Sequence, residues 1–162
     1  MARVFLYAPQ DFRNLCVLSR TLEVLGQTEC FVYDRFGLIR ERYGRYRARE
    51  QRVVSAGAFQ KIAWRRVEAP EEFLANWAGR VVGTVADEAA SALETFRFQA
   101  DDLLVFGSES QGLPSPIVAR CHRAVTIPSR GCTQSLNLAV ALGVVLFECT
   151  RQLGPNLLSL PR

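Results

Sequence analysis

The chain has 162 residues, of which 49% are hydrophobic and 22% are charged, as in an ordinary globular domain. Its most apolar run, after Ser135, lasts about a dozen residues, whereas roughly 18 are needed to cross a bilayer. The N-terminus shows no secretory signal segment. We therefore expect a single domain over residues 1–162, a cytoplasmic location and no membrane partner.

The cysteines and the histidine do not form a metal or disulfide pattern. The five cysteines are odd in number, widely spaced and without a C-x-x-C pair. His122 is the single histidine, so it has no second histidine with which to share a metal. We therefore expect neither a disulfide framework nor a bound metal.

The basic residues are almost all arginine: of the 20 lysines and arginines only Lys61 is a lysine, and the net charge is +4. Arginine presents a planar fork that grips phosphate and stacks on bases. Seven arginines gather in residues 35–52 among aromatic residues. This mixture favours RNA binding, with Arg42, Arg45 and Arg47 as candidate contacts, and a solvated surface segment is the alternative.

The hydrophobic pattern alternates between strands and helices. In chain order it predicts a strand at 3–8, a helix carrying Leu15, Leu18, Leu22 and Leu25 and ending at Gly26, a strand at 29–34, the basic segment without an apolar period, a strand within 59–67, a helix from Pro70 to Gly79, a strand at 80–86, a turn or short helix before 98, a strand at 102–109, a short helix at 115–121, a strand at 124–129, and a final helix closed by Gly154.

Strands that are apolar throughout and alternate with helices indicate a mostly parallel sheet with helices on both faces. Ligands of such sheets bind beyond the carboxyl ends of the strands. Three unusual loops follow predicted strands there: "GTVADE", "GSESQGLP" and "IPSRGCTQS". The last loop leads into the final helix, which we expect to be buried, with the polar Ser135 and Asn137 in its first turn.

Familiar nucleotide and hydrolase motifs are missing from these loops. The first predicted strand ends in "YAPQDFRN", which has no glycine and cannot form the dinucleotide-binding turn. A Walker A loop cannot be built, because Lys61 is the single lysine and does not stand in that motif, and "GSESQG" does not have the G-x-S-x-G pattern of a serine hydrolase.

The order of "NLCVLSR", "FGSESQGLP" and "IPSRGCTQSLNLAVALG" resembles the three motifs of the SpoU branch of the SPOUT class of RNA methyltransferases. The resemblance covers nearly the whole chain and is greatest to the minimal members, which consist of the catalytic domain alone and include the enzyme that methylates the wobble ribose of tRNA. It implies an α/β fold with a C-terminal trefoil knot, a homodimer and S-adenosylmethionine as cofactor.

The cofactor residues implied by the resemblance lie in the three loops: Thr84, Gly107, Ile127, Ser135 and Leu136. Much of this contact would be with the backbone. Gly107 and Gly112 would then let the main chain approach the adenosine closely, and two ordinary turn glycines are the alternative.

The resemblance assigns catalytic roles to Arg20, Asn14, Glu109, Ser135 and Asn137. A guanidinium does not normally lose its proton, so we expect Arg20 to grip the phosphate beside the target and to stabilise the developing alkoxide rather than to act as a base. Asn14 would orient the target, and Glu109 would shape the cofactor pocket or hold Arg20.

Less specific interpretations of these residues stay open at this point. Arg20 suits a solvated charge on an amphipathic helix, Asn14 and Ser135 suit helix caps, and Glu109 suits a solvated carboxylate. For the whole chain the resemblance favours ribose 2′-O-methylation of tRNA. The alternatives are methylation of rRNA, methylation of a base, and a catalytically silent knotted RNA-binding protein. The substrate stays open because "GSESQGLP" departs from the "GPETRGLP" typical of the tRNA wobble enzymes.

Overall fold

The computed structural model describes residues 2–39, 45–133 and 135–154, with the backbone alone at positions 45 and 46. Its elements in chain order are β1 (Arg3–Tyr7), α1 (Phe12–Val24), β2 (Glu29–Tyr33), α2 (Arg45–Ser55), the 3-10 helix η1 (Ala58–Lys61), β3 (Ala63–Arg66), α3 (Pro70–Ala75), β4 (Val81–Thr84), β5 (Ser91–Ala92), β6 (Leu103–Phe106), α4 (Ser115–Val118), β7 (Arg123–Thr126) and α5 (Leu138–Leu153).

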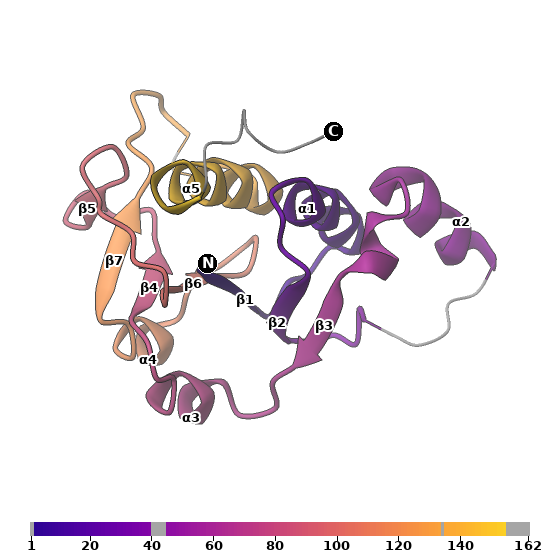
Figure 1. Cartoon of the computed structure of the whole chain (residues 1–162), viewed down its shortest axis with the longest axis horizontal. Helices are drawn as coiled ribbons and strands as arrows, with labels where there is room; N and C mark the ends of the chain where they lie inside the picture. The colour runs from indigo at the N-terminus through magenta and orange to yellow at the C-terminus, as the bar shows by residue number, and fades with distance from the viewer. Residues whose placement is uncertain (1, 40–44, 134, 155–162) are drawn as a thin grey trace.

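The strands form one seven-stranded sheet in the order β3-β2-β1-β6-β4-β7-β5, and every pair of neighbours is parallel. Helices cover both faces (Figure 1): α1 and α5 lie side by side on one face, and the short α3 and α4 lie on the other. The parallel α/β sheet predicted from the hydrophobic pattern is confirmed.

Each face of the sheet has its own core. On the α1 and α5 side, Leu15, Leu18 and Leu22 of α1 are fully buried, together with Leu142 and Leu146 of α5. On the other side, aromatic residues pack around Phe5, and α3 and α4 each bury one aliphatic residue, Leu74 and Ile117. Both faces of the central strands are therefore buried, as their apolar sequences predict.

Helix α1 has a definite signal at each end. The side chain of Asp11 accepts a hydrogen bond of 2.7 Å from the backbone N–H of Arg13, which makes Asp11 the N-cap. Past the C-terminal end, Gly26 has a φ of +79°, a left-handed conformation that favours glycine. Asn14 therefore lies inside the first turn, and its interpretation as a helix cap is wrong.

Helix α2 was not predicted, because its sequence has no apolar period. The helix packs beside α1, and its half-buried Val54 lies against the apolar core. Gln51 and Ser55 are buried, and the Ser55 hydroxyl donates to the carbonyl of Gln51 at 2.6 Å. The guanidinium of Arg47 lies 5.5 Å from the ring centroid of Phe12, the first residue of α1. Polar burial of this kind leaves no hydrophobic pattern in the sequence.

Helix α5 begins later than the sequence suggests, and it is not buried all round. Asn137 is its N-cap, with Oδ1 accepting from the N–H of Ala139 at 2.8 Å, and Ser135 lies before the helix. Both Ser135 and Asn137 are exposed, so the expectation of a buried polar first turn is wrong. Within the described residues, no helix combines the length and the apolarity that a membrane span requires.

Candidate active site

The three unusual loops leave neighbouring strands at one edge of the sheet. Strands β6, β4 and β7 are adjacent and parallel, so the segments after Thr84, Phe106 and Thr126 all begin at their carboxyl ends. The segment between β1 and α1 begins at the same edge, because β1 is parallel to β6. The predicted convergence of the loops is confirmed, although they are far apart in sequence.

A directed chain of hydrogen bonds joins the segments that follow β1, β6 and β7. The N–H of Ala139 donates to Oδ1 of Asn137, Nδ2 of Asn137 donates to Oδ1 of Asn14 at 3.1 Å, and Nδ2 of Asn14 donates to Oε1 of Glu109 at 3.0 Å. The ends of the chain fix the orientation of both amides, since a backbone N–H can only donate and a carboxylate only accepts. We call this group, from Asn137 through Asn14 to Glu109, the amide chain.

Glu109 also holds the segment between β1 and α1. Its Oε2 accepts from the backbone N–H of Gln10 at 2.8 Å, and its Oε1 accepts from the N–H of Asp11 at 3.2 Å. Three donors therefore converge on one half-buried carboxylate. The sequence analysis missed these two backbone contacts, because a main-chain N–H leaves no mark in a residue pattern. Arg20 is not among the partners of Glu109.

One of the predicted cofactor residues, Thr84, has a buried polar atom without a partner. Among the described residues, Oγ1 of Thr84, at the carboxyl end of β4, is the buried side-chain oxygen that makes no hydrogen bond. Such an atom carries a desolvation cost unless a ligand or water satisfies it. Ile127 is half-buried, whereas Ser135 and Leu136 are exposed in the segment before α5. This edge of the sheet therefore suits a polar ligand beside Thr84.

The two glycines of the second motif serve the protein's own turn. A Cβ on Gly107 would lie 2.0 Å from the carbonyl carbon of Gly112, so only glycine fits there. Gly112 has a φ of +64°, and its backbone exchanges hydrogen bonds with that of Ser108 at 2.9 and 3.0 Å. This turn explains why both positions need glycine, and the close approach of an adenosine ligand stays a prediction.

Arg20 lies away from the amide chain within the same molecule. It is six residues after Asn14, which places it about 9 Å further along α1. Its side chain is exposed and has no hydrogen-bond or ion-pair partner among the described residues. The structure thus brings Asn14, Glu109 and Asn137 together and leaves Arg20 on the outer face of α1.

The candidate RNA residues fall partly outside the described part of the chain. Arg42 lies outside the described residues, and of Arg45 only the backbone at the start of α2 is described. Arg47 is exposed and lies against Phe12. The described part of α2 is nevertheless strongly basic on its surface, and it packs beside the first turn of α1.

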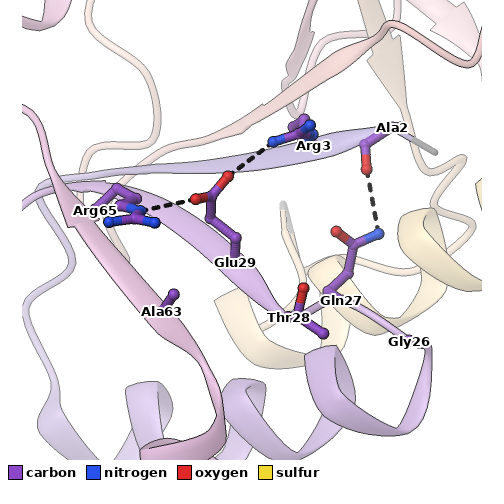
Figure 2. A pocket seen from close by; sticks show the side chains of 8 residues that line it. All are labelled: Ala2, Arg3, Gly26, Gln27, Thr28, Glu29, Ala63 and Arg65. Carbon is purple, nitrogen blue, oxygen red and sulfur yellow. Dashed lines mark hydrogen bonds and ion pairs between the residues drawn. The ribbon is translucent and has the colours of Figure 1, made fainter.

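A pocket of about 480 Å³ at the opposite edge of the sheet is a structural feature rather than a second active site (Figure 2). There Arg3 and Arg65 both contact Glu29, at 2.8 and 2.7 Å. The hydrogen bond from Arg65 is the main cause that lowers the pKa of Glu29. Nearby, Gln27 donates to the carbonyl of Ala2 at 3.2 Å. The pocket's polar side chains thus hold the amino ends of β1, β2 and β3 together.

Metal chemistry has no support in the described part of the chain. Its histidine, cysteine, aspartate and glutamate side chains form no cluster of three or more that is able to hold an ion. Burial raises the pKa of the Cys16 thiol, on α1, to about 11, so this thiol stays protonated at neutral pH. The hydrogen-bonded side chains of the amide chain are two amides and one carboxylate.

Comparison with known proteins agrees with the arrangement of the three motifs. The chain is 35% identical over 105 residues to the 23S rRNA (guanosine-2′-O-)-methyltransferase RlmB of Acinetobacter baylyi, and this match covers 62% of the chain and 42% of that protein. The chain thus spans less than half the length of this curated relative.

Two solved structures share the fold. One, on the 2-OH methylation of C/U34 on tRNA, has a TM-score of 0.80 at 30% identity, covering 94% of this chain and 96% of that one. The other is the SpoU methyltransferase AviRb from Streptomyces viridochromogenes in complex with the cofactor AdoMet, with a TM-score of 0.74 at 27% identity, covering 94% of this chain and 60% of that one. The trefoil knot stays a prediction.

The family match includes all three motifs and every strand of the sheet. Residues 1–147 match the SpoU rRNA Methylase family. This range contains the whole amide chain, from Asn14 through Glu109 to Asn137, as well as Thr84. The chain therefore belongs to the SpoU rRNA methylase family.

Proposed function

We propose that this protein transfers the methyl group of S-adenosylmethionine to a ribose 2′-hydroxyl of RNA. The observation that carries the proposal is the amide chain, because it ties the three motifs of an RNA methylase family together at the edge of the sheet where the hydroxyl of Thr84 is unpartnered. AviRb, which has the same fold, is known in complex with this cofactor. In this chain Thr84, the turn at Gly107, and the segment from Ile127 to Leu136 would hold the cofactor.

The residues at this edge are suited to orientation. S-adenosylmethionine supplies an electrophilic methyl group. Each side-chain amide of the amide chain has one N–H that its chain bond does not use, and Asn14 and Asn137 would direct these donors at the ribose oxygens. Holding two reactants in line supplies roughly 7–11 kcal/mol of such a barrier. Glu109 keeps Asn14 in place, and Arg20 would stabilise the developing alkoxide while the proton leaves to water or a neighbouring acceptor.

A second copy of the chain accounts for the position of Arg20. Large apolar side chains are exposed along α1 and α5, at Val17, Val24, Val140, Val144 and Phe147; we call this surface the α1/α5 apolar face. Its members recur at helical spacing, and contiguous apolar surface of this kind marks a protein interface. Arg20 lies between Val17 and Val24 on the same stripe of α1. We infer a homodimer built on this face, in which Arg20 serves the site of the partner.

We propose tRNA as the substrate. The solved structure concerned with C/U34 of tRNA matches this chain over nearly the full length of both. The relative that acts on 23S rRNA is more than twice as long as the region it shares with this chain. The basic helix α2 would dock the RNA, since arginine suits both phosphate and base contacts.

Two measurements test the proposed function. Calorimetry should detect binding of S-adenosylmethionine, and the absence of binding at millimolar cofactor would leave only a silent RNA-binding protein. Incubation with bulk tRNA and labelled cofactor should then label the RNA. Nuclease mapping should find a phosphodiester that resists cleavage, because a ribose methyl blocks hydrolysis at the adjacent phosphate. A labelled nucleotide that is still cleaved would show base methylation instead.

A further inference from the structure

A groove runs between α2 and the first turn of α1. It has a volume of about 270 Å³ and is lined by Arg13, Arg49, Glu50, Val53 and Val54. Arg13 belongs to α1 and the other four residues belong to α2. The groove adjoins the amide chain, because Arg13 and Asn14 are consecutive residues with Cα atoms about 3.8 Å apart.

The groove carries excess positive charge. Arg13 pairs with Glu50, which neutralises one of the two guanidinium groups. Arg49 is exposed and has no ion-pair or hydrogen-bond partner among the described residues. Arg13 also lies in the first turn of α1, where the helix dipole disfavours a cation. The unpaired charge of Arg49, beside an Arg13 whose charge Glu50 balances, leaves a net positive groove that suits an anion.

The floor of the groove is apolar. Val53 is 69% exposed, although its neighbours on the surface of α2 are charged. Val54 is half-buried and packs against the core. A surface that only contacts phosphate has no need of an exposed valine, whereas ribose and base faces are apolar. Two arginines over two valines therefore match a nucleotide better than a free inorganic anion.

We propose that this groove, which we call the α1/α2 groove, binds the nucleotide next to the methylated one in the RNA. Arg13 and Arg49 contact its phosphate, and Val53 contacts its sugar or base. The inference rests on the proposed function, and it adds a second subsite that positions the target ribose at Asn14. The groove discriminates through its apolar contact with the flanking nucleotide, so it contributes to the choice of RNA.

The test compares Arg49→Gln and Val53→Ser with the control Arg123→Gln, which removes the same charge from the amino end of β7, at the opposite edge of the sheet. Binding of bulk tRNA is measured at several salt concentrations. Arg49→Gln should weaken binding about fivefold and reduce the salt slope by about 0.7 to 0.9, the loss of one phosphate contact. Val53→Ser should weaken binding about threefold at an unchanged slope, because only an apolar contact is lost.

Three further readouts make the result decisive. Cofactor affinity and melting temperature should match the unmodified protein in both groove variants, and the KM for tRNA should rise while kcat stays constant. Equal effects of Arg49→Gln and Arg123→Gln would overturn the proposal. A change of oligomeric state in Val53→Ser with unaltered tRNA binding would also overturn it, because the groove would then be a contact between copies. RNA binding is measured without methylation, so failure of the proposed activity is seen separately.

Discussion

Replacing Glu109 by glutamine tests whether the amide chain positions Asn14. In the structure, Oε1 of Glu109 accepts from Asn14 Nδ2 and Asp11 N, and Oε2 accepts from Gln10 N. A glutamine has one acceptor oxygen and one NH₂ group. If the oxygen takes the place of Oε1, the NH₂ group faces the N–H of Gln10, so one hydrogen bond is lost and two donors meet.

The free-energy cost of Glu109→Gln depends on how exposed the affected hydrogen-bonding groups are. An unsatisfied polar group costs about 1–3 kcal/mol, and the lower end applies here because Gln10 is exposed and water can reach its N–H. About 1 kcal/mol corresponds to a fall in melting temperature of about 2–4 °C for a protein of this size. The larger effect is on catalysis, since a displacement of about 1 Å in a positioning group costs about 100-fold in rate.

The assay is methyl transfer to bulk tRNA with labelled cofactor, alongside a thermal melt and calorimetry with S-adenosylmethionine. Glu109→Gln should lower kcat about 100-fold, with the small loss of melting temperature given above. The matched control is Glu94→Gln, which removes an exposed carboxylate that has no hydrogen-bond or ion-pair partner among the described residues. A Glu109→Gln variant with the kcat of the control would refute the positioning role of the amide chain.

Three other outcomes are expected. Arg20→Ala should abolish turnover while cofactor affinity stays within about threefold, a change of less than 1 kcal/mol. Mixing Arg20→Ala with Asn14→Ala protomers should recover activity, because a mixed dimer keeps one site with Asn14 and a partner's Arg20; no recovery would contradict the dimer arrangement. Cys132 is exposed in the segment before α5, whereas Cys16, Cys30 and Cys149 are buried; a thiol reagent at neutral pH should label Cys132 first, and S-adenosylmethionine should slow this labelling if the segment encloses the cofactor. The hydrogen bond from Arg151 is the main cause that lowers the pKa of Glu148 to about 2 from its usual 4.5. The pair therefore stabilises the fold above pH 4.5, and this part of the stability should be lost as the pH falls toward 2. Acid titration of the unfolding free energy should show this loss in the unmodified protein and not in Glu148→Gln.

The sequence predicts the sheet and α1 well, because their signals are local. The central strands β1, β4 and β6 are largely apolar, and α1 combines an apolar stripe with Asp11 before it and Gly26 after it. The edge strand β5, of sequence SA, lies in the stretch expected to hold a turn or short helix and has no such signal. Helix α2 escapes prediction because its contacts are a cation over Phe12 and a buried Gln51 rather than an apolar stripe. The start of α5 shifts for a similar reason: Asn137 caps the helix, and the polar residues before it need no burial.

For the site, the order of the motifs predicts which residues come together, but it does not predict the direction of the hydrogen bonds between them. Asn14, Glu109 and Asn137 are joined as their motifs suggest, yet the direction of each amide depends on the Ala139 N–H and on the carboxylate at the other end. At Gly107 the sequence pattern does not tell which structural requirement selects the glycine. A glycine required by its own turn and a glycine required by a ligand have the same sequence pattern, and only the 2.0 Å approach to Gly112 separates them.

The charges of the site argue that one molecule does not complete it. The amide chain contains one charged group, the carboxylate of Glu109, and no cation. An RNA strand brings further negative charge, and the attacking ribose oxygen becomes more negative as its proton leaves. These charges need a cation at the reacting oxygen, and Arg13, the neighbour of Asn14 in the same molecule, is already paired with Glu50. Arg20 is about 9 Å along α1 from Asn14, among the exposed Val17 and Val24. Packing two copies on the α1/α5 apolar face would bury those valines and carry Arg20 toward the partner's amide chain. The proposed contact would thus cover the exposed apolar surface and supply a cation to the reacting oxygen.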